Sequence, residues 1–398
     1  MHTKQAVTVP FYIFMMLVIL SPLAIDVFLP AIPVMAQALQ TELGNVQATV
    51  AIFLAAMGIG QILAGPFADK YGRRPLALLG IGLYVIGGIF ASVANNIETL
   101  WLSRVLQGLG ACAVSVTAMS GIRDCYGPER SSTMYSYVNG VICVIPALAP
   151  MLGGLLTEFG GWRYNFYLIT VIGCLVGALV ALKLPETRPE QSATQAKLIS
   201  WERYCRVLEH PVFRFHTGLI MLSMAIIIGY VTTSTEVLMV KMLQSPFAFS
   251  LWFGSNAAIN ILAAFIAPRF IHKVGKRNAL KVAVFACLFS GIGLVLFKQS
   301  VNPLAYMLPV YCASVGFCIL FGLSGGAALK PFGDNAGTAS ALMGLFQMTG
   351  ASVLVGLLQL LPISGSEILA ILMALPLFWV AFARWCSPNF EQIQATLK

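Results

Sequence analysis

Apolar stretches recur along the whole chain, and each is long enough to cross a membrane as a helix. About 30 Å of hydrocarbon requires roughly 20 apolar residues in a helix. Glycines, prolines and charged residues separate these stretches from one another. The predicted spans are 10–35, 45–67, 75–94, 98–121, 134–157, 163–183, 212–240, 248–270, 279–297, 304–328, 336–361 and 367–386. The pattern predicts an all-α membrane protein with 12 transmembrane helices.

The longest polar insert lies near the middle of the chain, from Leu184 to Pro211, and leaves six spans on either side. We therefore expect an N-terminal six-helix bundle over 1–184, a cytoplasmic linker over 185–211 and a C-terminal six-helix bundle over 212–398. The first apolar stretch is too long for a cleavable signal peptide and lacks a small-residue cleavage site. We interpret it as a retained first span.

Composition agrees with a membrane protein and excludes a soluble globular one. Of the 398 residues, 58% are hydrophobic and 10% are charged, and the net charge is +9. With the N-terminus in the cytoplasm, about 20 of the 24 Lys and Arg residues fall in cytoplasmic segments, which is the positive-inside bias. The basic charge thus indicates a lipid bilayer and no nucleic acid as partner, with both termini cytoplasmic.

The chain contains a degenerate internal repeat. The segment "GPFADKYGRR" between spans 2 and 3 aligns with "PRFIHKVGKR" between spans 8 and 9. Gly72 lies opposite Gly275, and Arg73 and Arg74 lie opposite Lys276 and Arg277. Two parallel six-span halves follow from such a repeat. The second half has His272 where the first has Asp69, so its version of the segment is weaker.

Four motifs, at four different spans, carry a resemblance to a known family. "GPFADKYGRR" matches the G-x-L-A-D-R-x-G-R-[RK] signature of the major facilitator superfamily, with Phe67 and Lys70 as departures. "RVLQGLG" from Arg104 resembles the R-x-x-Q-G-x-G motif of drug:proton antiporters. "PALAPMLGG" from Pro146 resembles the antiporter motif, and "DVFLP" from Asp26 resembles an Asp-x-x-Leu-Pro motif. The chain resembles this superfamily, and within it the Bcr/CflA and MdtL type of multidrug exporters.

The resemblance implies a fold and a function together. It implies the major facilitator fold, with two pseudo-symmetric six-helix bundles in the inner membrane of a bacterium. It also implies proton-coupled export, by alternating access, of lipophilic drugs such as chloramphenicol-type antibiotics. We expect a monomer. A proton-coupled exporter of a native metabolite, such as a sugar or a nucleoside, would share these motifs and stays an alternative.

The segment between spans 2 and 3 is a candidate conformational latch. Gly72 allows a tight turn, Asp69 can face a helix N-terminus of the other half, and Arg73 can pair with Asp124. The alternative is that the charges of this segment serve only to orient the chain in the membrane by the positive-inside rule. The predicted latch residues are Gly65, Asp69, Gly72, Arg73, Arg74 and Asp124.

Asp26 is the leading candidate for proton coupling, because an ionisable residue inside a span is costly and suggests function. Pro30 leaves the Asp26 carbonyl without its helical hydrogen bond. Arg104 lies at a similar depth, so the two could share an ion pair or a polar network; a purely structural pair is the alternative. Glu236 is a second proton site or an ordinary solvated acid.

Two further groups of residues complete the predicted site. Polar and aromatic residues within spans could line a drug cavity, although each alone could equally bond neighbouring helices. These are Asp26, Tyr137, Asn139, Tyr230, Asn256, Asn260 and Gln347. The antiporter hinge residues, which could instead serve close helix packing, are Pro146, Pro150, Gly153 and Gly154.

Enzymatic chemistry has little support in the sequence. The chain lacks the H-E-x-x-H and G-x-S-x-G motifs and a Walker A loop, so we expect neither an enzyme nor ATP-driven transport. Its nine cysteines and four histidines show no spacing typical of disulfides or zinc. We expect no cofactor and no metal.

Overall fold

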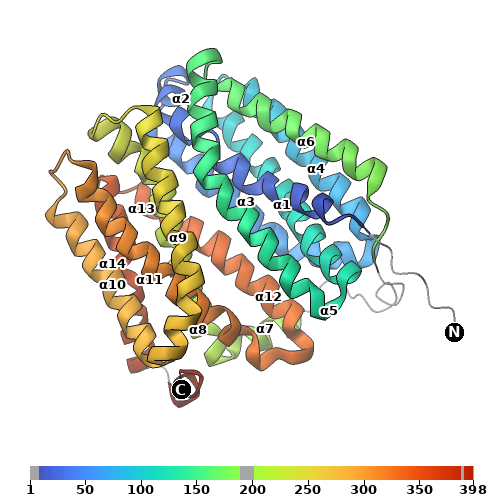
Figure 1. The fold of residues 1–398 in the computed structure, drawn as a ribbon, viewed down its shortest axis with the longest axis vertical. Coiled ribbons are helices and arrows are strands. Elements are labelled where there is room, and N and C mark those ends of the chain that lie inside the picture. The colour runs from blue at the N-terminus through green and yellow to red at the C-terminus, as the bar shows by residue number, and fades with distance from the viewer. Residues whose placement is uncertain (1–8, 189–200, 387–389, 398) are drawn as a thin grey trace. The chain divides into compact units, whose positions relative to one another are not determined.

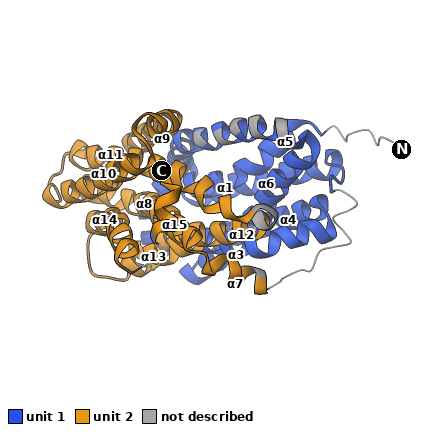
Figure 2. Ribbon diagram, turned by 90° about the horizontal axis from the view of Figure 1, so that it is seen from below, with its two compact units in different colours: residues 1–41, 52–199 blue, residues 42–51, 200–398 orange. Residues whose placement is uncertain are grey.

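The computed structural model describes residues 9–188, 201–386 and 390–397. Within these ranges the backbone forms helices joined by short turns, without strands (Figure 1). The chain divides into two compact units, one of residues 1–41 and 52–199 and the other of residues 42–51 and 200–398 (Figure 2). The expected linker runs into residues 189–200, which lie outside the described part of the chain.

The helices up to residue 183 lie in the first half of the chain. They are α1 (Phe11–Asp26), η1 (Leu29–Ala31), α2 (Ile32–Ala38), α3 (Leu43–Tyr71), α4 (Arg73–Ser92), α5 (Ile97–Gly160) and α6 (Arg163–Lys183).

The remaining helices follow the linker. They are α7 (Trp201–Glu209), α8 (Pro211–Thr235), η3 (Glu236–Lys241), α9 (Pro246–Val274), α10 (Lys276–Leu296), α11 (Pro303–Leu329), η4 (Lys330–Asn335), α12 (Ala336–Leu345), η5 (Phe346–Gly350), α13 (Ala351–Gln359), α14 (Gly365–Cys386) and α15 (Phe390–Thr396).

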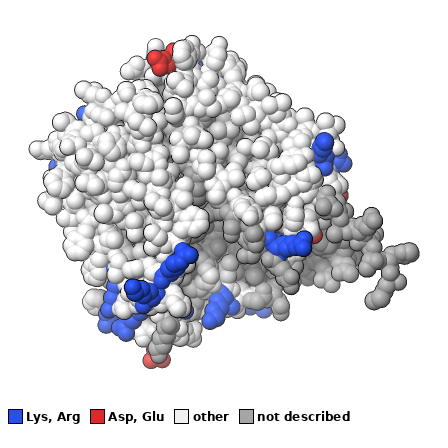
Figure 3. Space-filling view, in the orientation of Figure 1, with Lys and Arg blue, Asp and Glu red and all other residues white. Residues whose placement is uncertain are grey.

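Twelve helical segments of the described chain are long and apolar enough to cross a membrane. They coincide with the twelve predicted spans, with ends shifted by a few residues. Charged side chains are sparse on the face shown in Figure 3, most of which is uncharged. The prediction of 12 transmembrane helices is confirmed.

The first span is broken rather than merely kinked. Helix α1 ends at Asp26, and the chain continues through the 3₁₀ turn η1 into α2. Pro30 and Pro33 have no N–H to continue the helical ladder, which is why the break lies here. Asp26 therefore lies at a helix end instead of within a continuous helix.

The fourth and fifth spans both lie in the segment labelled α5, which consists of two helices that meet at a kink at Gly127. Gly127 has φ 72°, a left-handed value that glycine adopts without strain, and a proline follows it. The bend separates the spans Ile97–Gly127 and Gly140–Gly160. The predicted spans end at 121 and begin again at 134, whereas in the structure the helices on both sides continue to Gly127.

Glycines bring α4 and α5 into close contact in the first unit. A Cβ atom on Gly80 would lie 2.7 Å from the Cβ of Ala113, and one on Gly110 would lie 2.4 Å from the carbonyl oxygen of Gly80. Small residues at such contacts allow helix backbones to approach closely in a membrane. This packing places the start of α4 beside the middle of α5, where the polar cluster described next is found.

Candidate functional site

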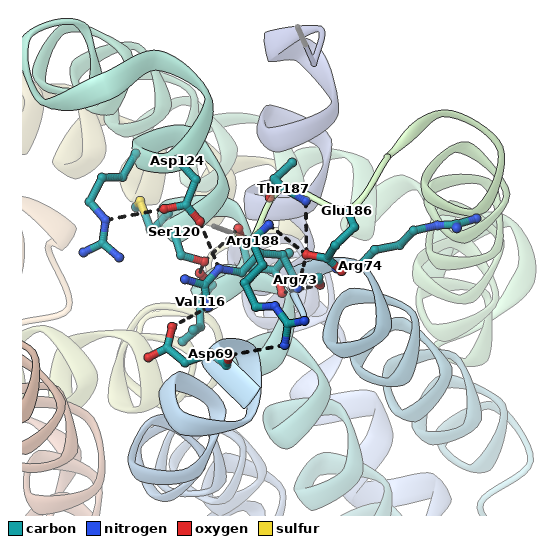
Figure 4. Close-up of polar contacts among 12 residues, drawn as sticks. Asp69, Arg73, Arg74, Val116, Ser120, Asp124, Glu186, Thr187 and Arg188 are labelled. Atoms are coloured by element: carbon teal, nitrogen blue, oxygen red, sulfur yellow. Dashed lines mark hydrogen bonds and ion pairs between the residues drawn. The ribbon is translucent and has the colours of Figure 1, made fainter. Parts of the chain in front are cut away.

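The turn between α3 and α4 holds a cluster of charged side chains. Gly72 has φ 110° and lets the chain reverse between Tyr71, the last residue of α3, and Arg73, the first of α4. The side chain of Arg73 is only 3% exposed and lies between two carboxylates (Figure 4). Its Nη1 is 2.7 Å from Oδ1 of Asp69, and its Nε is 3.1 Å from Oδ2 of Asp124. The structure thus brings together three of the four charged residues of the predicted latch.

Burial makes this ion-pair cluster sensitive to change. The Asp124 side chain is 7% exposed, whereas that of Asp69 is 46% exposed. Removing one partner of a buried pair leaves an uncompensated charge, which costs about 3–5 kcal/mol. The inner pair, Arg73 with Asp124, therefore ties α4 to α5, while Asp69 adds a charge that water can reach.

Glu186 completes the cluster, although it lies within the expected linker and belongs to none of the predicted latch residues. Its Oε1 accepts a hydrogen bond of 2.8 Å from the backbone N–H of Arg73, and its Oε2 accepts one of 3.2 Å from that of Arg74. The carboxylate also accepts from the backbone N–H groups of Thr187 and Arg188. The segment after α6 thereby caps the N-terminus of α4, whose first N–H groups have no helical partner.

Two neighbouring arginines donate further hydrogen bonds to backbone carbonyls around the same turn. Arg188 donates from Nη1 to the backbone carbonyls of Asp69 and Lys70, in the last turn of α3 (Figure 4). Arg74 donates from Nη2 to the carbonyl of Ala181 at 2.8 Å, near the end of α6. A basic group at a helix C-terminus and an acidic group at a helix N-terminus both match the helix dipoles.

The two glycines of the predicted latch differ in their surroundings. A Cβ atom on Gly72 would lie 2.3 Å from Oε2 of Glu186, so a side chain would displace the capping carboxylate. A Cβ atom on Gly65 would meet no atom within 4 Å. The structure gives a reason for glycine at residue 72 and none at residue 65.

Asp26 and Arg104 lie near the end of α1 but do not pair. Asp26 is 4% exposed, and its carboxylate takes part in no ion pair or hydrogen bond within the described part of the chain. Arg104 is fully buried and donates from Nη2 to the carbonyl of Ala24 at 2.9 Å and from Nη1 to Oε1 of Gln107 at 2.5 Å. The structure therefore favours a shared polar region over a direct ion pair.

Two phenylalanine rings lie beside the guanidinium of Arg104, and a tyrosine bonds to the same part of α1. Its guanidinium carbon is 4.9 Å from the ring centre of Phe28 and 4.6 Å from that of Phe53. Such contacts stabilise a cation where water is excluded. Tyr84 donates to the carbonyl of Leu20 at 2.8 Å, one turn earlier in α1. The last turns of α1 are thus held from α4 and α5.

The predicted hinge in α5 packs against the residue that follows Asp26. A Cβ atom on Gly153 would lie 1.5 Å from the carbonyl oxygen of Val27, so only glycine fits this contact. Pro150 and Gly154 are buried nearby in sequence, and Pro146 is half-buried. Close packing of α5 on the end of α1 is therefore observed, which joins the antiporter motif to the proton-coupling candidate.

Most predicted cavity residues of the second unit serve contacts between helices. Tyr230 of α8 stacks on Phe253 of α9, with ring centres 5.4 Å apart. The Oδ1 atom of Asn256 accepts a 2.8 Å hydrogen bond from Ser314 of α11. Asn260 donates from Nδ2 to the hydroxyl of the same Ser314 at 3.4 Å. For these three residues the structure favours the helix-packing alternative.

The remaining predicted residues are placed as follows. Glu236 begins the π-helical turn η3 and accepts a 3.2 Å hydrogen bond from the backbone N–H of Gly365, the first residue of α14. Gln347 lies half-buried in the π-helical turn η5. Tyr137 is exposed and contacts the ring of Phe11 edge-on. The side chain of Asn139 lies outside the described residues. Glu236 thus has a capping role that the sequence did not indicate.

Comparison with known proteins identifies the family of the chain. The family model described as Major Facilitator Superfamily matches residues 14–355. The multidrug resistance protein MdtL of Salmonella typhi is 30% identical over 353 residues, which cover 89% of this chain and 88% of that protein. The MdtL protein of Salmonella paratyphi B is also 30% identical, over 356 residues, with the same coverage of 89% and 88%.

Solved structures show the same fold at low sequence identity. A POT family transporter crystallised with 5-aminolevulinic acid has a TM-score of 0.76 at 14% identity and covers 95% of this chain and 96% of its own. The xylose transporter XylE from E. coli, in a partially occluded inward open conformation, has a TM-score of 0.71 at 15% identity, with coverage of 95% and 97%. The expected fold class is confirmed. The chain is a multi-pass membrane transporter, not an enzyme, and it belongs to the Major Facilitator Superfamily.

Proposed function

We propose that this protein exports lipophilic drugs from the bacterial cytoplasm in exchange for protons. Its relatives at 30% identity are named multidrug resistance proteins, which supports efflux of drugs as the coarse function. The observation that carries proton coupling is Asp26, a buried acid at the end of α1 that forms no ion pair with the described residues. Ionisable groups within spans are rare and commonly lie on ion or proton pathways.

Asp26 has the chemistry that exchange requires. The carboxylate binds one proton to become a neutral carboxylic acid, and loses the same proton when the charged form is favoured again. Because α1 is interrupted beside it, the acid lies where backbone groups are free to meet water or cargo. Drug and proton then occupy the protein in alternation, and each lowers the affinity for the other.

Arg104 supports this site by position. Its guanidinium holds a carbonyl two residues before Asp26 and does so without neutralising the carboxylate. The contact between Gly153 and Val27 fixes the other side of the same segment. Movement of α5 against α1 would therefore shift the backbone next to Asp26. In this proposal the hinge motif of α5 couples conformation to the proton site.

The cluster at the α3–α4 turn serves as the conformational latch of the proposal. Arg73, Asp69 and Asp124 bias the protein towards one conformation without touching cargo, as a population shift requires. Glu186 joins them as the cap of α4. By the positive-inside rule this turn lies on the cytoplasmic side of the inner membrane, together with both termini.

Vesicle transport tests the proposal directly. In inside-out vesicles from cells that express the protein, an imposed proton gradient should drive uptake of a phenicol and of unrelated lipophilic drugs. An uncoupler should abolish that uptake, and expression should raise drug tolerance of a susceptible bacterium. Uptake that is unchanged by the uncoupler contradicts proton coupling. If a sugar or nucleoside is transported and no drug is, the native-metabolite alternative is correct.

A further inference from the structure

The short helix α15, near the end of the chain, is docked on the second unit. Ile393 is 1% exposed and Leu397 is 8% exposed, whereas Gln394 between them points to solvent. Leu397 directly follows Thr396, the last residue of α15, so both buried side chains lie near the end of the helix. Helix α15 packs against α8. The helix is thus a fixed part of the unit.

A buried histidine forms a hydrogen bond with the last residue of α15. His216 of α8 is fully buried, and its Nε2 is 2.9 Å from the hydroxyl oxygen of Thr396. That hydroxyl donates its own proton to the carbonyl of Ile393 at 2.6 Å. Since a threonine hydroxyl has one proton to donate, it accepts from His216, and the imidazole proton is assigned to Nε2. The hydrogen bond therefore runs from α8 to α15.

The same residue of α15 reaches the turn between α9 and α10. The Nζ of Lys276 donates to the backbone carbonyl of Thr396 at 3.2 Å. Lys276 is the first residue of α10 and follows Gly275, whose φ is 82°. Thr396 thus contacts both α8 and the start of α10. One residue at the end of α15 links two helices that are distant in sequence.

The internal repeat gives this contact a counterpart in the first unit. Lys276 and Gly275 occupy the positions of Arg73 and Gly72. In the first unit, the segment after α6 brings Glu186 to the start of α4. In the second unit, α15 contacts the start of α10 through Thr396. His272, at the position of Asp69, cannot supply the carboxylate that the first unit uses.

We propose that α15 is a strap that holds the α9–α10 turn, docked through His216 and Thr396. In the second unit the strap takes the place of the carboxylate cluster of the first. Thr396 and His216 are positioning residues, because they act on the turn and not on cargo. The consequence for transport, a lower turnover with unchanged drug affinity when the strap is undocked, rests on the proposed function.

Hydrogen exchange of the purified full chain in detergent tests the strap without any substrate. Thr396→Val keeps the shape of the side chain and removes the hydroxyl. Loss of one such hydrogen bond should speed amide exchange in peptides that cover α15 by about three- to tenfold. Peptides that cover the α9–α10 turn should also exchange faster. Thr396→Ser, which keeps the hydroxyl, should behave like the wild type, as should Gln394→Ala on the exposed face.

Three results would overturn the strap. They are unchanged α15 exchange in Thr396→Val, a change confined to α15 that spares the α9–α10 turn, and a failure of Thr396→Ser to restore protection. His216→Phe provides a second route, since it keeps a buried ring and removes the donor; it should reproduce the effect of Thr396→Val. Amide hydrogen exchange measures only how firmly α15 is docked. These outcomes therefore do not depend on whether the protein transports drugs.

Discussion

At the scale of single residues, two side chains of opposite charge stabilise the α3–α4 turn. The acidic one binds the N-terminus of α4, and the basic one binds the C-terminus of α3. Glu186 meets backbone N–H groups at the start of α4, and Arg188 meets backbone carbonyls at the end of α3. Unpaired groups at helix ends carry partial charges of these signs. Gly72 leaves the space that the carboxylate occupies. Glu186 thus contacts the backbone N–H of Arg188 and fills the space beside Gly72.

The charge of Glu186 should therefore matter more than its size. In Glu186→Gln, one oxygen is replaced by an amide group that faces backbone donors. An N-terminal cap is worth about 1 kcal/mol, so we expect a stability loss of that order, measured by thermal unfolding in detergent. Drug affinity should stay within about twofold while transport turnover falls. Glu202→Gln, on the exposed surface of α7, is the control. Equal turnover in the two variants would contradict a latch role for Glu186.

At the scale of helices, the contact between α5 and the end of α1 leaves no room for a side chain. The Val27 carbonyl lies where the Cβ of residue 153 would be. In Gly153→Ala the helices have to separate, and forcing extra volume into packed contacts costs about 1–3 kcal/mol. We expect a lower melting temperature and a severe loss of transport. Gly140→Ala, in the same helix with no atom near its Cβ, should change neither. Normal transport by Gly153→Ala would contradict the hinge.

The membrane spans can be predicted from the sequence, whereas the interruptions of the helices within them can be predicted only in part. Twenty apolar residues are a sufficient signal for a membrane helix, and Pro30 marks the break after Asp26. The π-helical turns at 236–241 and 346–350 lack such a signal. They depend on how the neighbouring helices pack. Helix α15 likewise lies beyond the last predicted span, which ends at residue 386.

Contacts of the candidate site can be predicted from the sequence where both partners are charged side chains within or near a motif. Arg73 and Asp69 lie four residues apart on the same turn, and Asp124 is an acid near the end of a span. Glu186 was missed because its partners are backbone N–H groups, 112 residues away for Arg74, and these have no signature in the sequence. His216 and Thr396 are 180 residues apart, which hides their contact in the same way. The cavity role of Asn256 stays a prediction, because the sequence does not distinguish a hydrogen bond to cargo from the one to Ser314.

At the scale of the whole molecule, the distribution of basic residues predicts the orientation in the membrane. Lys273, Lys276 and Arg277 surround the α9–α10 turn, whereas the α10–α11 turn has only Lys298. Alkaline phosphatase fused after Gln299 should be active in the periplasm, and the same enzyme fused after Gly275 should be inactive. A fluorescent protein fused after the C-terminus should fluoresce, as it does in the cytoplasm. The reversed pattern would contradict the predicted orientation.

The exchange of drug for proton is a property of the whole molecule that one residue should control. If Asp26 carries the coupling proton, drug added to detergent-purified protein in weak buffer should release protons, because the two ligands oppose each other by linkage. Asp26→Asn resembles the protonated acid permanently, so it should bind neutral drug, release almost no proton and fail to accumulate drug against a gradient.

Glu236→Gln is the matched control for this measurement, since Glu236 is the other predicted proton site and the structure uses it to cap α14. It should release protons as the wild type does. Equal release from the wild type and Asp26→Asn would move the coupling site away from Asp26. If Glu236→Gln alone abolishes the release, the coupling acid lies in the second unit. Asp26 would then be a structural acid at the end of α1, where Arg104 and Gly153 already fix the backbone.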